Sequence, residues 1–272
     1  MHFSDEILAT ADPPSEGVHN PIHDEEGADA AGYAGALVAG VRTYGWAVRT
    51  ITRALGGAWL TSGWVDYSLK RPLFAKETMT IKVTETNNDA WTVTCTAGDD
   101  CRVVLEGTAG FGPAPWLQEL NPPAAAPPAE PVPPLPSYQL ATVPLNKPLH
   151  PLGAWLTSET AASMVCDDLA TNDPHYVQTA QAPVPIHPYF LAGRMAPLTR
   201  HNFTYGPTIH VRSQIQHKRE GYSDRQIIVG ASIVDAYERN GHWYQILDGL
   251  VTDAEGELAR IRHHTIFRPR GT

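Results

Sequence analysis

A proline-rich segment divides the sequence into two parts of similar length. It runs from Gly112 to Pro136, reads GPAPWLQELNPPAAAPPAEPVPPLP and holds ten prolines in 25 residues. Proline fixes φ and lacks an amide donor, so this stretch favours an extended, polyproline-like conformation over a helix or an inner strand. Because about half of the chain follows it, we expect residues 112–136 to connect two units, residues 1–111 and 137–272.

Both parts show the same order of expected elements. In the first, the apolar run GALVAGVRTYGWAVRTITRALGG predicts a helix that ends at Gly56 and Gly57. In the second, HPYFLAGRMAPLTRHN predicts a helix that Pro197 ends or kinks early. About four strand-like runs, separated by turn signals such as GDD, RNG and AEG, follow each helix.

Short matches align the two parts. LVAG at 37–40 aligns with FLAG at 190–193, and the basic pair at 70–71 aligns with the pair at 218–219. A repeat of this length exceeds the periods of solenoid proteins. We therefore predict a duplicated α+β unit.

The composition indicates a folded, acidic protein. With 42% hydrophobic and 18% charged residues the chain can bury a core, and its net charge of -9 argues against a general nucleic-acid surface. Three cysteines, Cys95, Cys101 and Cys166, favour a reducing compartment over a disulfide framework, although a cross-link between the first two is an alternative. Without signal-peptide features or a run of eighteen apolar residues, we expect a cytoplasmic protein that does not enter membranes.

One motif carries most of the functional information. HNPIH, at 19–23, places two histidines around Asn-Pro ahead of the first expected helix, and YSLKRPLFAKETMTIKVTE follows that helix. Together with LVAG these residues resemble the MaoC-like hot-dog family, which includes R-specific enoyl-CoA hydratases. The resemblance covers roughly residues 16–110, and more weakly 137–270. It implies a double hot-dog fold of the α+β class, in which two antiparallel sheets each wrap a central helix and pair edge to edge.

The resemblance also implies a substrate and catalytic residues. The substrate would be a thioester of coenzyme A or acyl carrier protein, with no separate cofactor. The family's catalytic histidine falls on His23, its asparagine on Asn20, and the glycine whose N–H holds the thioester oxygen on Gly40. Histidine suits the base that activates water near neutral pH, and an amide at a helix N-terminus suits the developing enolate oxygen.

The sequence departs from the family's pattern at the catalytic aspartate, which falls on Val18. Valine cannot exchange a proton, so another group has to take this role. The candidates are His19 above all, then Glu16, Asp24, Asp168 and Asp173. In the second part NDPHY puts Tyr176 at the histidine position, and only Gly193 retains its expected place as the oxygen-binding glycine.

Further residues are candidates for contact with substrate. They are Asn20, Asp168, Tyr176, His187, which resembles the His-Pro of acyl-carrier dehydratases, and Arg71. Arg71 and its basic neighbours suit the phosphates of coenzyme A, although charged guards of strand edges are an equally good reading. His263 and His264 have no carboxylate or cysteine at ligand spacing, so we expect no metal site.

These observations predict a hydratase or dehydratase that acts on a 2-enoyl or 3-hydroxyacyl thioester. The alternatives are a hot-dog thioesterase and a non-catalytic subunit that binds acyl thioesters. The expected partner is a small-molecule acyl thioester, together with a second copy of the chain or a related hot-dog chain.

Overall fold

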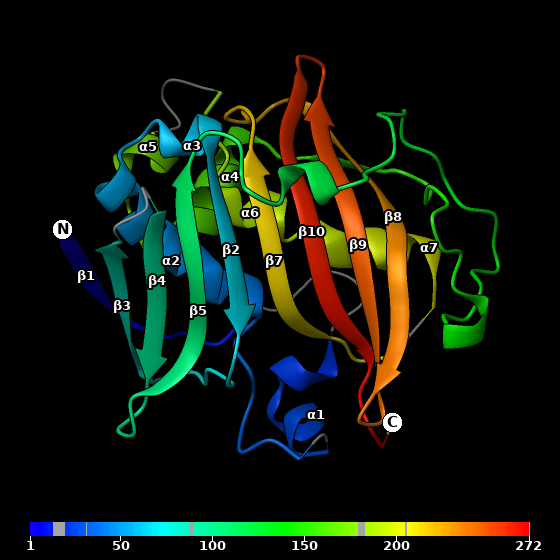
Figure 1. Cartoon of the computed structure of the whole chain (residues 1–272), viewed down its shortest axis with the longest axis horizontal. Coiled ribbons are helices and arrows are strands. Elements are labelled where there is room, and N and C mark those ends of the chain that lie inside the picture. The colour runs from blue at the N-terminus through cyan, green and yellow to red at the C-terminus, as the bar shows by residue number, and fades with distance from the viewer. Residues whose placement is uncertain (13–19, 31, 87–89, 179–182, 205, 272) are drawn as a thin grey trace.

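The computed structural model describes residues 1–12, 20–30, 32–86, 90–178, 183–204 and 206–271. Figure 1 shows one broad, twisted sheet with helices α2, α6 and α7 behind it. Within these residues the sheet has ten strands in the order β1-β3-β4-β5-β2-β7-β10-β9-β8-β6. The strands are β1 (His2–Leu8), β2 (Gly63–Leu69), β3 (Thr78–Glu85), β4 (Ala90–Ala97), β5 (Arg102–Phe111), β6 (Leu152–Trp155), β7 (Ile209–His217), β8 (Gln226–Arg239), β9 (His242–Asp253) and β10 (Gly256–Arg268).

The strand order has a centre of pseudo-symmetry between β2 and β7. Counted outward, β2, β5, β4, β3 and β1 of the first half match β7, β10, β9, β8 and β6 of the second. β2 and β7 pair antiparallel from Trp64 opposite Gln216 to Ser68 opposite Arg212. The sheets of the two halves therefore meet edge to edge, as the duplication predicts.

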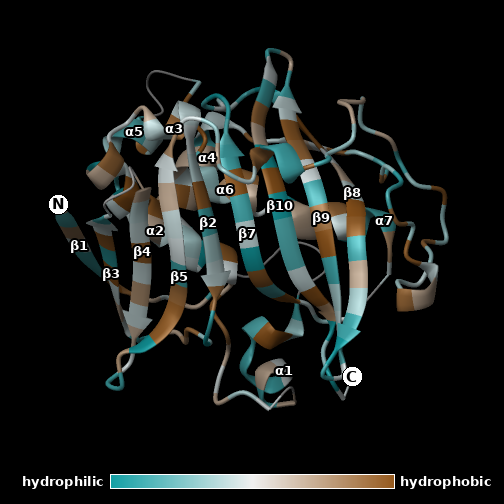
Figure 2. Ribbon diagram, viewed as in Figure 1, coloured by the Kyte–Doolittle hydropathy of each residue, from teal (hydrophilic) through white to brown (hydrophobic). Residues whose placement is uncertain are grey.

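Helix α2 (Gly40–Leu55) is the central helix of the first half. It ends at Gly56, whose φ of 86° and N–H bond to Thr52 O confirm the predicted end. Tyr44, Ala47 and Ile51 are buried at helical spacing, so this face of α2 packs against the sheet. Figure 2 shows hydrophobic and hydrophilic residues alternating along several strands, which leaves one face of the sheet apolar for the helices.

The central helix of the second half is interrupted. α6 (Pro188–Ala192) and α7 (Met195–Asn202) are separated by Gly193 and Arg194. The interruption lies one turn ahead of Pro197, which has no amide to donate to the Gly193 carbonyl, so it agrees with the prediction that Pro197 ends or kinks this helix early. The remaining helices are η1 (Pro21–His23), α1 (Glu25–Ala30), α3 (Trp59–Ser62), η2 (Leu117–Glu119), η3 (Leu140–Thr142), α4 (Ser158–Ser163), η4 (Met164–Asp168) and α5 (Pro174–Val177).

The same offset of 148 residues relates two pairs of elements in the two halves (188 − 40 and 226 − 78), whereas the other paired strands start 146 to 154 residues apart. Gly40 opens α2 and Pro188 opens α6, while Thr78 opens β3 and Gln226 opens β8. The alignment of LVAG with FLAG is therefore wrong. LVAG precedes α2 and its last residue, Gly40, is the first of that helix, whereas FLAG consists of the last three residues of α6 and its C-cap.

The same offset gives structural counterparts at the central helices. It pairs Ala39, the residue ahead of α2, with His187, and Gly45 with Gly193. His23, the third residue of η1 after the N-cap Asn20, corresponds to Tyr176, the third residue of α5 after the N-cap Asp173.

The proline-rich segment is packed rather than free. Trp116, Leu117 and Leu120 are buried, and the N–H of Asn121 donates to Asp248 Oδ2 at 2.7 Å. Figure 1 shows this segment passing in front of β10 and β9, on the opposite side of the sheet from α2.

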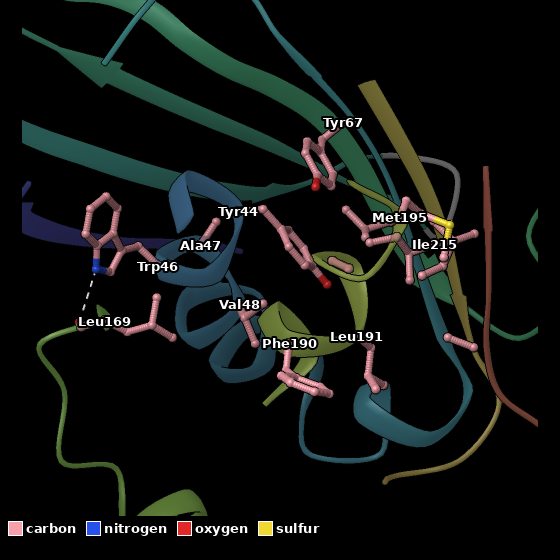
Figure 3. Packing of buried hydrophobic residues seen from close by; sticks show 14 of the residues in the cluster. Tyr44, Trp46, Ala47, Val48, Tyr67, Leu169, Phe190, Leu191, Met195 and Ile215 are labelled. Atoms are coloured by element: carbon pink, nitrogen blue, oxygen red, sulfur yellow. Dashed lines mark hydrogen bonds between the residues drawn. The ribbon is translucent and has the colours of Figure 1, made fainter. Parts of the chain in front are cut away.

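One hydrophobic core runs through both halves. The rings of Tyr44 on α2 and Tyr67 on β2 stack at 4.8 Å, and Leu191 and Met195 of the second half belong to the same core (Figure 3). The three cysteines are unpaired. None of the helices in the described ranges has the length and apolar character needed to cross a membrane.

Candidate active site

A cavity of about 530 Å³ lies at the N-terminus of α2. The first half contributes the segment ahead of α2, the first turn of α2 and the end of β2. The second half contributes α6, α7, β7 and β10. The cavity is thus closed by both halves, which is where the resemblance places the substrate.

His23 projects into this cavity from the short helix η1. Asn20 caps η1 and Pro21 is its first residue, so the HNPIH motif sets the direction of the imidazole. His23 Nδ1 lies 2.7 Å from the Leu37 carbonyl and 2.9 Å from Asp12 Oδ2. Two acceptors at Nδ1 place the proton there, so Nε2 is left as the basic nitrogen.

Asp12 is the carboxylate beside His23. Its Oδ2 also accepts the Ala39 N–H at 2.9 Å, and its Oδ1 accepts from Arg42 Nη1 at 2.7 Å. Arg42 is buried on α2 and also donates to carbonyl oxygens of Thr10 and Asp168. The carboxylate is therefore held from three sides and oriented toward the imidazole.

None of the described residues predicted to replace the family's aspartate occupies this position. Asp24 accepts the N–H of Gly27, and Asp173 caps α5 by accepting from the N–H of His175. Both carboxylates are thus engaged away from His23, and the expectation for them was wrong. His19, Glu16 and Val18 lie outside the described residues.

The surroundings shift the pKa values of the pair in opposite directions. Burial raises the pKa of Asp12, but its bonds to His23 and Arg42 outweigh this and lower it. Burial lowers the pKa of His23, but the carboxylate of Asp12 outweighs this and raises it. Asp12 therefore stays ionised and makes His23 a stronger base.

Gly40 opens α2 and lines the cavity beside Ala39 and Val41. The first N–H groups of an α-helix have no partner inside the helix, so the Gly40 N–H is available to an oxygen in the cavity. A Cβ at this position would lie 2.1 Å from Leu69 Cδ1. A side chain at position 40 would therefore have to displace the end of the Leu69 side chain on β2.

Gly193 does not occupy the corresponding position. It is the C-cap of α6, and its N–H donates to the Tyr189 carbonyl at 3.0 Å. The prediction that Gly193 keeps an oxygen-binding amide is wrong, because that amide is already used. Gly193 instead lines the cavity of the first half, opposite α2.

The structure separates the predicted substrate-contacting residues. Asn20 and Arg71 line the cavity of His23, whereas Tyr176 and His187 line a different one. Asp168 lines neither cavity. Its carboxylate accepts from the Tyr189 hydroxyl at 3.1 Å, and its carbonyl accepts from Arg42.

The side-chain amide of Asn20 has a bonded nitrogen and an oxygen without a hydrogen-bond partner among the described residues. Its Nδ2 donates to the Thr208 carbonyl at 2.8 Å and lies 3.4 Å from His23 Nε2, which is long for a hydrogen bond. Its buried Oδ1 has no partner among the described residues. A water or substrate hydroxyl in the cavity would supply the missing donor.

Most of the basic residues considered for phosphate binding form ion pairs with carboxylates of neighbouring strands. Lys70 Nζ lies 2.7 Å from Glu106, and Arg212 binds both oxygens of Asp66. These pairs support the reading as charged strand residues. Arg71 has no such partner among the described residues and lies on the cavity wall.

Three further histidines, His210, His242 and His263, line the cavity, and their motifs gave no sign of it. Ser213 Oγ bridges His210 Nε2 at 2.8 Å and His263 Nδ1 at 2.9 Å. Burial lowers the pKa of His210 to about 3 and that of His263 well below its usual value, so both rings are neutral.

No family model and no curated protein matches the sequence. Solved structures do match over nearly the whole chain. A protein from Chloroflexus aurantiacus, described as a MaoC domain dehydratase, shares 10% identity with a TM-score of 0.64, covering 100% of this chain and 95% of that one. A Mycobacterium tuberculosis protein described as having a double hot-dog fold shares 14% identity with a TM-score of 0.59, covering 89% and 86%.

A protein from Lactobacillus plantarum, described as an oleoyl thioesterase, shares 10% identity with a TM-score of 0.52, covering 99% and 98%. At these identities the likeness establishes the fold. The chain has the predicted double hot-dog fold, which MaoC-like dehydratases and thioesterases share.

Proposed function

We propose that this protein is an acyl-thioester hydratase or dehydratase whose active site is the cavity of His23. One observation carries the proposal. A partly buried imidazole, made more basic by Asp12, shares a cavity with the first turn of the central helix α2. A base and a fixed amide donor are the two groups that water addition to a conjugated thioester requires.

The reaction uses few groups. His23 Nε2 takes a proton from water, and the water oxygen bonds to C3 of the 2-enoyl thioester. The electrons of the double bond move to the thioester oxygen, where the Gly40 N–H stabilises the enolate. The enolate collapses as the protonated His23 returns the proton to C2. One water is added, and dehydration is the reverse.

The surrounding residues position these groups. Asp12 keeps the proton of His23 on Nδ1, and Arg42 with the Ala39 N–H keeps Asp12 in place. Asn20 Oδ1 is suited to accept a hydrogen bond from the attacking water. Arg71 on the cavity wall is suited to the phosphates of coenzyme A.

A thioesterase is the second candidate, because the site offers one base and one oxyanion donor, which also suffice for attack of water on the acyl carbon. Crotonyl-CoA separates the two reactions. A hydratase converts it to 3-hydroxybutyryl-CoA with the thioester intact, whereas a thioesterase releases free thiol. We expect the hydroxyacyl thioester without thiol release. Thiol release would replace the proposal by the second candidate, and binding without either product would indicate a non-catalytic subunit.

The pH dependence of the reaction follows from the raised pKa of His23. The base form is needed, so kcat/KM should rise with pH through an inflection above the usual histidine value of about 6.5. In Asp12→Asn the carboxylate that raises the pKa is absent and burial lowers it, so the inflection should move to lower pH. Rate profiles of both proteins measure this shift, and an unchanged inflection would contradict the role of Asp12.

The same pair predicts a pH effect on folding. Because the folded pKa of His23 is raised, its contribution to stability is full below the unfolded pKa and is lost as pH rises through the folded value. Chemical unfolding at several pH values should show this loss in the wild type and not in His23→Ala.

A further inference from the structure

A second cavity of about 660 Å³ lies in the same core and shares no lining residue with the first. Its walls come from α2, from residues 169–176 ahead of α6, and from His187. None of the roles assigned above to the first cavity explains its presence.

The two cavities occupy corresponding places in the duplicated fold. In the first, the segment ahead of α2 faces Gly193 of the second half, and in the second, the segment ahead of α6 faces Gly45 of the first half. Gly45 and Gly193 are counterparts under the offset that relates the halves. Tyr176, the counterpart of His23, lines the second cavity. The second cavity thus has the position of an active site without the imidazole at the position of the base.

The side chain of His187 lines this cavity and is more than nine-tenths buried. Its Nδ1 accepts the N–H of Tyr189 at 3.1 Å, which places the proton on Nε2. Burial lowers the pKa of His187 to about 3, so the ring is neutral and Nε2 remains a donor at ordinary pH. That donor has no hydrogen-bond partner among the described residues. An N–H without a partner on a cavity wall is available to an acceptor on a ligand or to water.

The rest of the wall is apolar at one side and basic at its edge. Trp46, fixed by its indole N–H bond of 3.1 Å to the Leu169 carbonyl, stands in the wall with Leu169 and Leu60 (Figure 3 shows the first two). Arg49, exposed on α2, has no carboxylate partner among the described residues.

The other charged side chains of this cavity already have partners. His175 Nε2 lies 2.6 Å from Glu220, Arg53 is paired with Asp5, and Asp173 caps α5. His175 is therefore a rim residue with its Nε2 occupied rather than a base aimed into the cavity.

We propose that the second cavity binds an acyl thioester of coenzyme A without converting it. The His187 Nε2–H donates to the thioester oxygen, the acyl group lies against Trp46 and Leu60, and Arg49 contacts the phosphates of the carrier. The proposal rests on the substrate class of the proposed function. It makes the chain a two-site protein with one site for turnover and one for binding only.

Calorimetric titration of the full chain with a thioether analogue of butyryl-CoA, in which a methylene inserted between the sulfur and the retained carbonyl prevents hydrolysis, tests this. We expect two analogue molecules per chain. His187→Asn keeps an acceptor for the Tyr189 N–H but does not reach as far as Nε2, so it should weaken one of the two sites by about tenfold or more. His187→Gln, whose amide nitrogen reaches the place of Nε2, should retain more of the affinity.

Arg49→Glu provides a second variant at an exposed position, and it should weaken the same site as His187→Asn. One analogue per chain that is insensitive to both variants would overturn the second site and leave the proposed function intact. Two sites that both ignore the variants would also overturn it. No binding at all would contradict the proposed function itself.

Discussion

His23→Ala should lower kcat for hydration of crotonyl-CoA by about two to four orders of magnitude, the usual contribution of a general base. Nε2 of His23 is the only basic nitrogen that we place against the attacking water, and Asp12 is too firmly held by Arg42 and the Ala39 N–H to substitute for it. The initial rate of loss of the enoyl thioester measures the effect. KM should change little, since the imidazole acts chiefly in the transition state.

His2→Ala is a matched control for this variant. His2 is exposed at the start of β1, where its ring contacts Thr84, and it lies outside both cavities. Its rate should equal that of the wild type. If His23→Ala retained full activity with an unchanged melting curve, the base would have to be another residue.

Asp12→Asn should impair both catalysis and folding. In the wild type one carboxylate oxygen accepts from His23 and Ala39 and the other accepts from Arg42. Asparagine replaces one of these oxygens by an NH2 group, which then faces an N–H donor and cannot bond to it. His23 then loses its fixed tautomer, and we expect kcat to fall by about a hundredfold or more. Removing the charge also leaves the buried Arg42 without its ionic partner, which costs about 3 kcal/mol of unfolding free energy.

Asp24→Asn separates the role of Asp12 from a general loss of acidic charge near His23. Asp24 is exposed and its carboxylate accepts the N–H of Gly27, a bond that asparagine can keep. Urea unfolding and kcat should stay close to the wild type. Equal losses in the two variants would contradict the assignment of Asp12 as the partner of His23.

Local patterns predicted the parts of this fold that depend on local chemistry. Gly56 ends α2 because its left-handed φ suits glycine, and this could be read from the Gly-Gly pair. HNPIH located His23 because asparagine and proline build the turn that directs the ring. The duplication followed from the repeated order of elements on either side of residues 112–136.

Asp12 was missed because its role depends on contacts that no local pattern contains. It stands in the sequence ADPPS, which reads as a solvent-exposed turn ahead of the motif. Its place is set by Arg42, which the helix pattern put on α2 without showing that its guanidinium is buried. A buried arginine needs a carboxylate, but that signal appears only once burial is known.

The sequence alignment of the second half with the first was wrong because it relied on the short match of LVAG with FLAG and not on the spacing of whole helices and strands. LVAG and FLAG share apolar and small residues, yet one precedes its helix and the other is inside α6. The distances between strand starts and helix starts relate the halves better, and they reassign Gly193 as a wall residue and His187 as the residue ahead of the helix.

A crystal structure of the protein with the butyryl-CoA thioether analogue tests the central claim most directly. The account predicts the carbonyl oxygen of the analogue within about 2.7–3.1 Å of the Gly40 nitrogen, with C3 of the acyl group facing His23 Nε2 in the same cavity. An analogue whose acyl group lies elsewhere, with the first cavity filled only by water, would contradict it.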